Sequence, residues 1–285
     1  MNQVWIQCED KNSLLTAIAE PGRVMIAGGT DLLINVRRLA PADKPAQMVD
    51  LSLVEELKNI HLEGNMLTIG SMVTYTQLMT DPLIRKHLPV LAEAASQVGS
   101  PQIRNRGTLG GSLVNASPAA DMAPLWILLK AQVKLESFGK ERILLVEDFL
   151  LGHQKTMLAP GEVMTEIRCL IPKKSVIYQK IGRRNAAAIA RLNGCCLLDR
   201  QEDTVKEIRL VIGAATPTPL DLQKDCSGWI DKPWTIERLD EVASQAMRRV
   251  EEISGRRASA TWKFPAIENL VRRLLLDAWA EGGKQ

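Results

Sequence analysis

Two consecutive glycines, Gly28 and Gly29, stand between a short apolar run and a helical pattern, and they constrain the fold of this chain more than any other feature. The run at 24–26 predicts a strand, and apolar residues within 32–39 recur at helical spacing. Glycines in such a turn let backbone N–H groups converge on an anion, because no Cβ blocks its approach and a helix N-terminus is electropositive. The pattern is also compatible with a plain tight turn in which Thr30 caps the helix.

A second segment, at 99–118, is rich in glycine, proline and small polar residues but carries little charge. We interpret it as a loop that wraps a ligand, because a solvated linker would carry more charge. Between 107 and 121, the polar side chains that could bind such a ligand are Thr108, Ser112, Asn115 and Ser117. The alternative is a structural Ω-loop in which Asp121 caps the following helix.

Neither glycine segment matches the common nucleotide-binding signatures. Gly28-Gly29 lacks the later glycines of GxGxxG, the glycines at 107–111 have a different spacing, and no Gly-Lys-Ser/Thr follows either segment. A bound dinucleotide would therefore be held in another way.

The length of 285 residues favours two domains, and the pattern of elements changes near residue 174. In the first part we predict strands at 48–51, 60–62, 66–69, 132–137, 142–146 and 162–171, with helices at 76–79, 89–98 and 121–129. In the second part we predict longer strands at 176–181, 188–198 and 205–214, and helices at 236–253 and 266–280. The second part should therefore be an antiparallel sheet covered by helices.

Composition excludes several classes of protein. The 36 basic residues are balanced by 33 acidic ones and aromatic residues make up only 4%, so nucleic-acid binding is not expected. The opening residues do not form a signal peptide and the longest apolar run, at 122–129, is far too short to span a membrane, so we expect a cytoplasmic protein. The five cysteines form no CxxC pair or cluster, which predicts reduced thiols and no metal site.

Several motifs together resemble the FAD-binding subunits of the xanthine dehydrogenase, carbon monoxide dehydrogenase and nicotinate dehydrogenase group. The two glycine segments carry most of the likeness, as AGGTDLL at 27–33 and QIRNRGTLGGSLVNASPAADMAP at 102–124. Similar segments continue in order along the chain, as IGSMVT at 69–74 (IGA-x-x-T in the family), QKIGRRNAAAIARLN at 179–193, IGAATPTP at 212–219 and GRRASATWKFPAIENLVRRLL at 255–275.

This resemblance implies an α+β fold with two domains. Residues 1–173 would form a two-lobed FAD-binding domain of the vanillyl-alcohol-oxidase (PCMH) type, with lobes at about 1–54 and 55–173. Residues 174–285 would form a smaller domain like the C-terminal domain of carbon monoxide dehydrogenase flavoproteins, with an antiparallel sheet and helices.

The resemblance also implies the residues that hold FAD. The two glycine segments would bind its diphosphate, ribityl and adenosine parts. Asp121 stands where the family has an acidic ligand, and Lys180 stands where the family has a lysine that contacts the cofactor. Ile167 would make an apolar or backbone contact. The expected cofactor-binding residues are Met25, Ile26, Ala27, Gly28, Gly29, Thr30, Asp31, Leu32, Thr108, Gly110, Gly111, Asn115, Ser117, Asp121, Ile167 and Lys180. No catalytic residue and no metal ligand is expected in this chain.

The function implied by the resemblance is electron transfer within a molybdenum hydroxylase complex. A molybdopterin-binding large subunit would oxidise the substrate, a [2Fe-2S] small subunit would relay electrons, and FAD in this chain would pass them to NAD⁺, oxygen or another acceptor. Two alternatives remain open. The chain could be a non-catalytic scaffold with weak or lost FAD binding, and Ser112 supports this alternative because it replaces a commoner asparagine. The chain could also be a stand-alone flavin oxidase.

Overall fold

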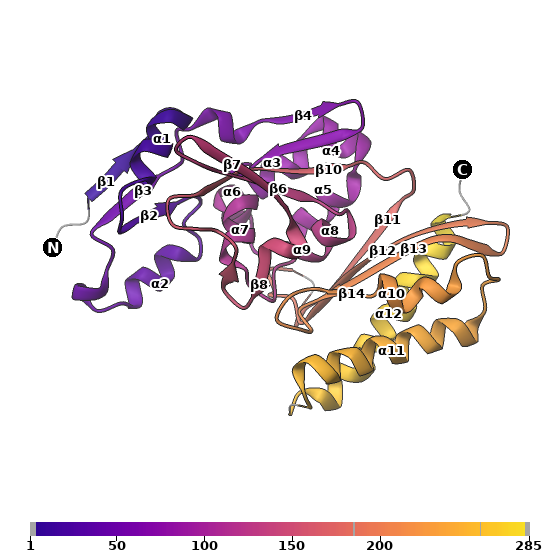
Figure 1. The fold of residues 1–285 in the computed structure, drawn as a ribbon. Coiled ribbons are helices and arrows are strands. Elements are labelled where there is room, and N and C mark those ends of the chain that lie inside the picture. The colour runs from indigo at the N-terminus through magenta and orange to yellow at the C-terminus, as the bar shows by residue number, and fades with distance from the viewer. Residues whose placement is uncertain (1–3, 185, 257, 283–285) are drawn as a thin grey trace. The chain divides into compact units, whose positions relative to one another are not determined.

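The computed structural model describes residues 4–184, 186–256 and 258–282 (Figure 1). Its backbone contacts divide the chain into two units. The first unit contains the chain up to Ser117 together with Lys130–Ile171, and the second contains Pro118–Leu129 together with the chain from Pro172 onward. A division at residue 173 alone would place 118–129 in the first part, whereas the contacts of this segment lie in the second unit.

The first lobe of the first unit is a small parallel sheet with order β1-β3-β2, formed by β1 (Val4–Gln7), β2 (Arg23–Ile26) and β3 (Gln47–Asp50). Two helices connect these strands, α1 (Lys11–Ile18) and α2 (Leu32–Arg38). The strand–glycine turn–helix arrangement predicted at 24–39 is therefore confirmed.

The second lobe is a five-stranded antiparallel sheet with order β4-β5-β10-β6-β7. Its strands are β4 (Ile60–Glu63), β5 (Met66–Gly70), β6 (Gln132–Ser137), β7 (Lys140–Leu145) and β10 (Val163–Leu170). The smaller elements of this lobe are α3 (Tyr75–Thr80), α4 (Pro82–His87), α5 (Pro89–Ser96), α6 (Pro101–Arg106), α7 (Leu109–Asn115), α9 (Val146–Phe149), β8 (Leu150–Gly152) and β9 (Lys155–Thr156).

The prediction of a loop throughout 99–118 was wrong, because this segment contains α6 and α7. Each helix begins at a hydroxyl cap: Ser100 Oγ accepts the backbone N–H of Ile103, and Thr108 Oγ1 accepts that of Gly111. Pro101 at the first helical position also favours α6, since its missing N–H would be unsatisfied there in any case. The Thr108 cap offsets part of the low helix propensity of the two glycines in α7.

Apolar packing and one charged cluster join the two lobes. A shared core contains Leu14 and Val49 from the first lobe with Met72 and Val163 from the second. Beside it, the carboxylate of the buried Glu136 on β6 pairs with Lys11 of α1 at 3.0 Å. The same carboxylate accepts a hydrogen bond from Thr165 Oγ1 at 2.9 Å. These contacts fix the distance between the lobes.

The second unit is built on the antiparallel sheet β11-β12-β13-β14, which confirms the predicted sheet covered by helices. Its strands are β11 (Val176–Ile181), β12 (Leu192–Gln201), β13 (Thr204–Gly213) and β14 (Leu220–Asp221), and its helices are α8 (Ala123–Leu128), α10 (Gln223–Cys226), α11 (Ile236–Ser254) and α12 (Ala260–Gly282). Helix α12 packs on β12, and α11 lies beside α12 (Figure 1). Strand β12 begins at Leu192 and not at residue 188, because its first residue pairs with Ile181, where the neighbouring strand β11 ends.

Helix α8 covers β12 and β13, although its sequence lies between two elements of the first unit. All six of its residues are buried. Hydrogen bonds hold both ends of the segment 118–129: Ala214, the residue after β13, donates its N–H to the Pro118 carbonyl at 3.1 Å, and Arg209 of β13 donates to the Leu128 carbonyl at 3.3 Å. A segment of the first half of the chain thus belongs to the second unit.

All five cysteines are free and buried. Burial raises the pKa of Cys169 and of Cys226 to about 12, which keeps both thiols protonated and unreactive at neutral pH. None of the five forms a disulfide in the structure. Within the three described ranges, no helix is both long enough and apolar enough to cross a membrane.

Candidate functional site

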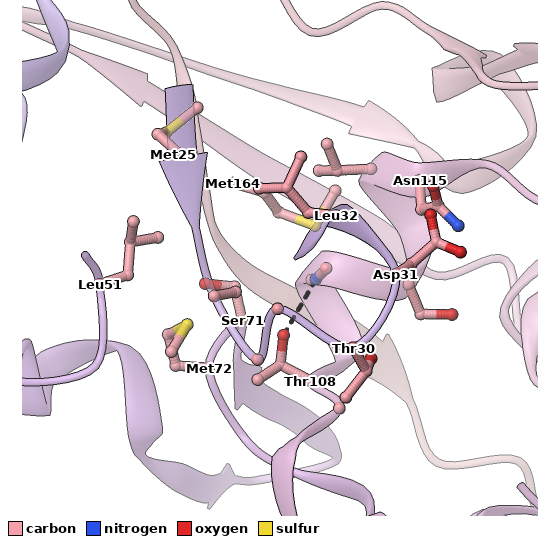
Figure 2. Close-up of a pocket in the computed structure, with 18 of the residues that line it drawn as sticks. Met25, Thr30, Asp31, Leu32, Leu51, Ser71, Met72, Thr108, Asn115 and Met164 are labelled. Atoms are coloured by element: carbon pink, nitrogen blue, oxygen red, sulfur yellow. Dashed lines mark hydrogen bonds between the residues drawn. The ribbon is translucent and has the colours of Figure 1, made fainter. Parts of the chain in front are cut away.

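A cavity of about 580 Å³ lies within the first unit, lined by residues of both of its lobes (Figure 2). This volume is typical of sites for small molecules and cofactors. The turn between β2 and α2 forms one wall, and α7 with the residues that precede it forms another. The two glycine segments, about 80 residues apart in sequence, are therefore brought together.

The first wall depends on both glycines. Gly29 has a φ of +71°, in the left-handed region that glycine adopts without strain. A Cβ on Gly28 would collide with the backbone carbonyl of Arg106, so the two glycine segments meet backbone to backbone. The cap position of α2 is Asp31, whose carboxylate accepts a hydrogen bond from Asn35 at 2.9 Å. The alternative in which Thr30 is the helix cap is not adopted, and Thr30 lines the cavity.

The second wall is held close to strand β5 by backbone hydrogen bonds. The Gly110 N–H donates to the Ser71 carbonyl at 2.8 Å, and a Cβ on Gly110 would lie 2.6 Å from the Ser71 Cβ. Thr108 is buried, and its Oγ1 accepts the Gly111 N–H at 3.2 Å, the dashed line of Figure 2. Glycine at 110 thus permits the close approach, and Thr108 sets the direction of the first turn of α7.

Replacing Thr108 by alanine should destabilise the first unit by about 1 kcal/mol, because the Gly111 N–H loses its cap. Thr108→Ser keeps the accepting oxygen and should retain most of the stability. Urea denaturation of the two variants and the wild type measures the difference. Equal midpoints for the alanine variant and the wild type would contradict the capping role.

The structure places eleven of the sixteen predicted cofactor residues on the cavity. They are Met25, Ala27, Gly28, Gly29, Thr30, Asp31, Leu32, Thr108, Gly110, Gly111 and Asn115. Three others belong to the first unit but do not line the cavity: Ile26 and Ile167 are buried in strands β2 and β10, and Ser117 lies just after α7.

Asp121 and Lys180, the remaining two, belong to the second unit and pair with each other. Lys180 Nζ lies 2.9 Å from Asp121 Oδ2, and the two side chains are only 6% and 9% exposed. The Asp121 carbonyl accepts hydrogen bonds from the Tyr178 hydroxyl at 3.1 Å and the Asn193 amide at 3.0 Å. Burial raises the pKa of Asp121, and the Lys180 charge opposes this shift without cancelling it.

The alternative in which Asp121 caps the next helix is wrong. Met122 occupies the cap position of α8, and the Asp121 carboxylate bonds to Lys180 instead. Asp121 Oδ1 is buried and has no hydrogen-bond partner among the described residues.

Residues outside the glycine segments complete the cavity, and sequence reasoning did not assign them a role. They include Arg23, Asn35, Leu51, Ser71, Met72, Leu158, Val163 and Met164. Arg23 is held in place by hydrogen bonds to Gln47 and to the Ala17 carbonyl, both at 2.7 Å. Ser71 and Met72 had a sequence signal, because both lie in the IGSMVT motif at 69–74.

Two family models match the chain and together cover most of it. Residues 1–174 match the model described as the FAD binding domain in molybdopterin dehydrogenase. Residues 177–278 match the CO dehydrogenase flavoprotein C-terminal domain.

Comparisons with curated proteins and with solved structures agree with the two family models. The chain is 32% identical to the carbon monoxide dehydrogenase medium chain of Hydrogenophaga pseudoflava over 260 residues, which covers 90% of this chain and 89% of the relative. It is 31% identical to the xanthine dehydrogenase FAD-binding subunit of Escherichia coli O157:H7, with 92% and 91% covered. Its fold is similar to a chain of quinoline 2-oxidoreductase from Pseudomonas putida 86, with a TM-score of 0.91, 26% identity, and 99% and 98% covered.

Proposed function

The chain belongs to the FAD-binding subunits of the molybdenum hydroxylases, and from this premise we propose that it passes electrons from the [2Fe-2S] clusters of a partner subunit, through FAD, to NAD⁺ or another acceptor. The observation that carries the proposal is the cavity of about 580 Å³ that is lined by both glycine segments. When bound, FAD supplies the redox chemistry, and the protein's part is to hold and tune it.

The residues around the cavity fit such a cofactor. A Cβ at Gly28 would collide with the Arg106 carbonyl and one at Gly110 with Ser71, so glycine at both positions lets the walls of the cavity pack closely on their neighbours. Apolar side chains such as Met25, Leu51 and Met164 line the rest of the cavity. This combination of polar side chains, such as Thr30 and Asn115, with apolar walls suits a molecule with both a diphosphate and a flat ring system.

We propose that the predicted residues on the cavity bind FAD directly. Asp121 and Lys180 stay in the proposal, since the buried Asp121 Oδ1 has no partner among the described residues and is available to accept a hydrogen bond. Ile26, Ser117 and Ile167 are proposed as supporting or backbone contacts. The chain itself needs no acid–base catalyst, because its residues position the cofactor and exclude water from it.

The proposed partners are a molybdopterin-binding large subunit and a [2Fe-2S] small subunit. The carbon monoxide dehydrogenase relative is named a medium chain, and the xanthine dehydrogenase relative is named a FAD-binding subunit, which is consistent with one subunit of a larger assembly. The substrate would then be selected by another polypeptide, and this chain would deliver the electrons.

Purification of the chain from its native host tests the proposal. We expect a yellow complex with stoichiometric FAD and two further subunits, and reoxidation of the reduced complex by NAD⁺ or oxygen, followed at the flavin absorption bands. A colourless chain that takes up no FAD in calorimetry would favour the scaffold alternative. Turnover of an organic substrate by the lone chain would favour the stand-alone oxidase.

A further inference from the structure

Ser71 stands on the cavity wall directly after β5, and Figure 2 shows its side chain among the lining residues. Its backbone is fixed on both sides. The Ser71 N–H donates to the Thr165 carbonyl at 2.9 Å, and its carbonyl accepts the Gly110 N–H at 2.8 Å. The position of this residue is therefore set by β10 and α7 together, independently of its hydroxyl.

The hydroxyl itself has no such bonds. The residue is 3% exposed, and Ser71 Oγ has no hydrogen-bond partner among residues 4–184, 186–256 and 258–282. A buried hydroxyl without a partner destabilises a folded protein, because its bonds to water are lost and not replaced. Alanine would fill nearly the same space without this penalty, so packing alone does not account for a serine here.

The surroundings allow the hydroxyl to reach a ligand. Serine occupies staggered positions about its Cα–Cβ bond, and rotation between them redirects Oγ at little cost. Gly110, which packs against the Ser71 Cβ, carries no side chain that would screen it from the cavity. A hydroxyl both donates and accepts, so it suits a phosphate oxygen, a sugar hydroxyl or a polar ring atom.

We propose that Ser71 is a cofactor-binding residue, whose hydroxyl forms a hydrogen bond with a polar atom of bound FAD. The inference rests on the proposed function and adds a residue to the same site. It also predicts two effects of opposite sign for the removal of the hydroxyl. The cofactor is bound less tightly, and the protein without cofactor becomes more stable.

The test compares the full-length wild type with Ser71→Ala. FAD is titrated into each apoprotein by calorimetry, and thermal unfolding is followed before FAD is added. For Ser71→Ala we expect the Kd for FAD to rise about three- to tenfold. The apoprotein should melt about 2 °C or more above the wild type. Ser96→Ala is a matched control, because the Ser96 hydroxyl donates to the Glu93 carbonyl on an exposed face of α5 and should affect FAD affinity in neither direction.

The outcomes separate the two claims. A wild-type apoprotein that does not bind FAD would overturn the proposed function. Wild-type binding with an unchanged Kd for Ser71→Ala would overturn the role of Ser71 and leave the proposed function intact. A less stable Ser71→Ala apoprotein would show that the hydroxyl already has a partner without FAD, which also overturns the role of Ser71.

Discussion

The Gly111→Val chain should be recovered without FAD. A Cβ at residue 111 lies 2.8 Å from Thr108 Oγ1 and 3.7 Å from the Ala27 Cβ, so the branched side chain would disturb the cap of α7 and extend toward the opposite wall. Both effects oppose a ligand between the two walls, and we expect the affinity for FAD to fall by about a hundredfold or more. The flavin-to-protein ratio after gel filtration measures the loss.

Gly228→Val is the matched control, since a Cβ at Gly228 would meet no atom within 4 Å. This residue belongs to the second unit, and its variant should keep a full complement of FAD. If Gly111→Val retained stoichiometric FAD as well, the placement of the cofactor against α7 would be wrong.

Lys180→Met should strongly destabilise the second unit. The methionine removes the partner of a carboxylate that remains buried, and breaking a buried ion pair in this way costs about 3–5 kcal/mol. The control is Lys206→Met, because Lys206 pairs with Asp231 at 2.7 Å on an exposed surface, where such pairs contribute about 0–1 kcal/mol. Urea denaturation of the two variants at pH 7 measures the difference.

The destabilisation by Lys180→Met should depend on pH in a definite direction. Burial already raises the pKa of Asp121 above its unfolded value, and removal of the Lys180 charge raises it further. A group with a raised folded pKa stabilises the protein below its unfolded pKa, and this contribution is lost as the pH rises through the folded value. The difference in the free energy of unfolding between wild type and Lys180→Met should therefore be larger at pH 7 than at pH 5. A gap that is constant or larger at pH 5 would contradict an ionised, buried Asp121.

Most strands could be predicted from the sequence because apolar residues recur regularly along each of them. The long strands of the second unit and the hairpin β4–β5 are examples, since each is apolar enough to be read without its neighbours. Helices α6 and α7 were missed because they are only six and seven residues long and contain little apolar periodicity. Their stability comes from the caps at Ser100 and Thr108 and from packing, which local propensity does not report.

The residues of the site, like the helices and strands, could be predicted only where the local sequence has a distinctive pattern. The glycine segments could be predicted because their composition is unusual, and the structure brings both onto one cavity. Arg23 could not, since a partly buried arginine at a strand start has no distinctive local pattern, and Ser71 was matched only as part of the IGSMVT motif, without an assigned role. The pairing of Asp121 with Lys180 was also missed, because it depends on the segment at 118–129 joining the second unit.

The assignment of 118–129 to the second unit matters for dividing this protein into fragments. The chain passes between the units at three points, so neither half is a contiguous stretch of sequence. A gene fragment starting at residue 174 would encode β12 and β13 without α8, the helix that packs on them, and would expose apolar surface prone to aggregation. Grafting 118–129 onto the start of such a fragment would restore the missing cover.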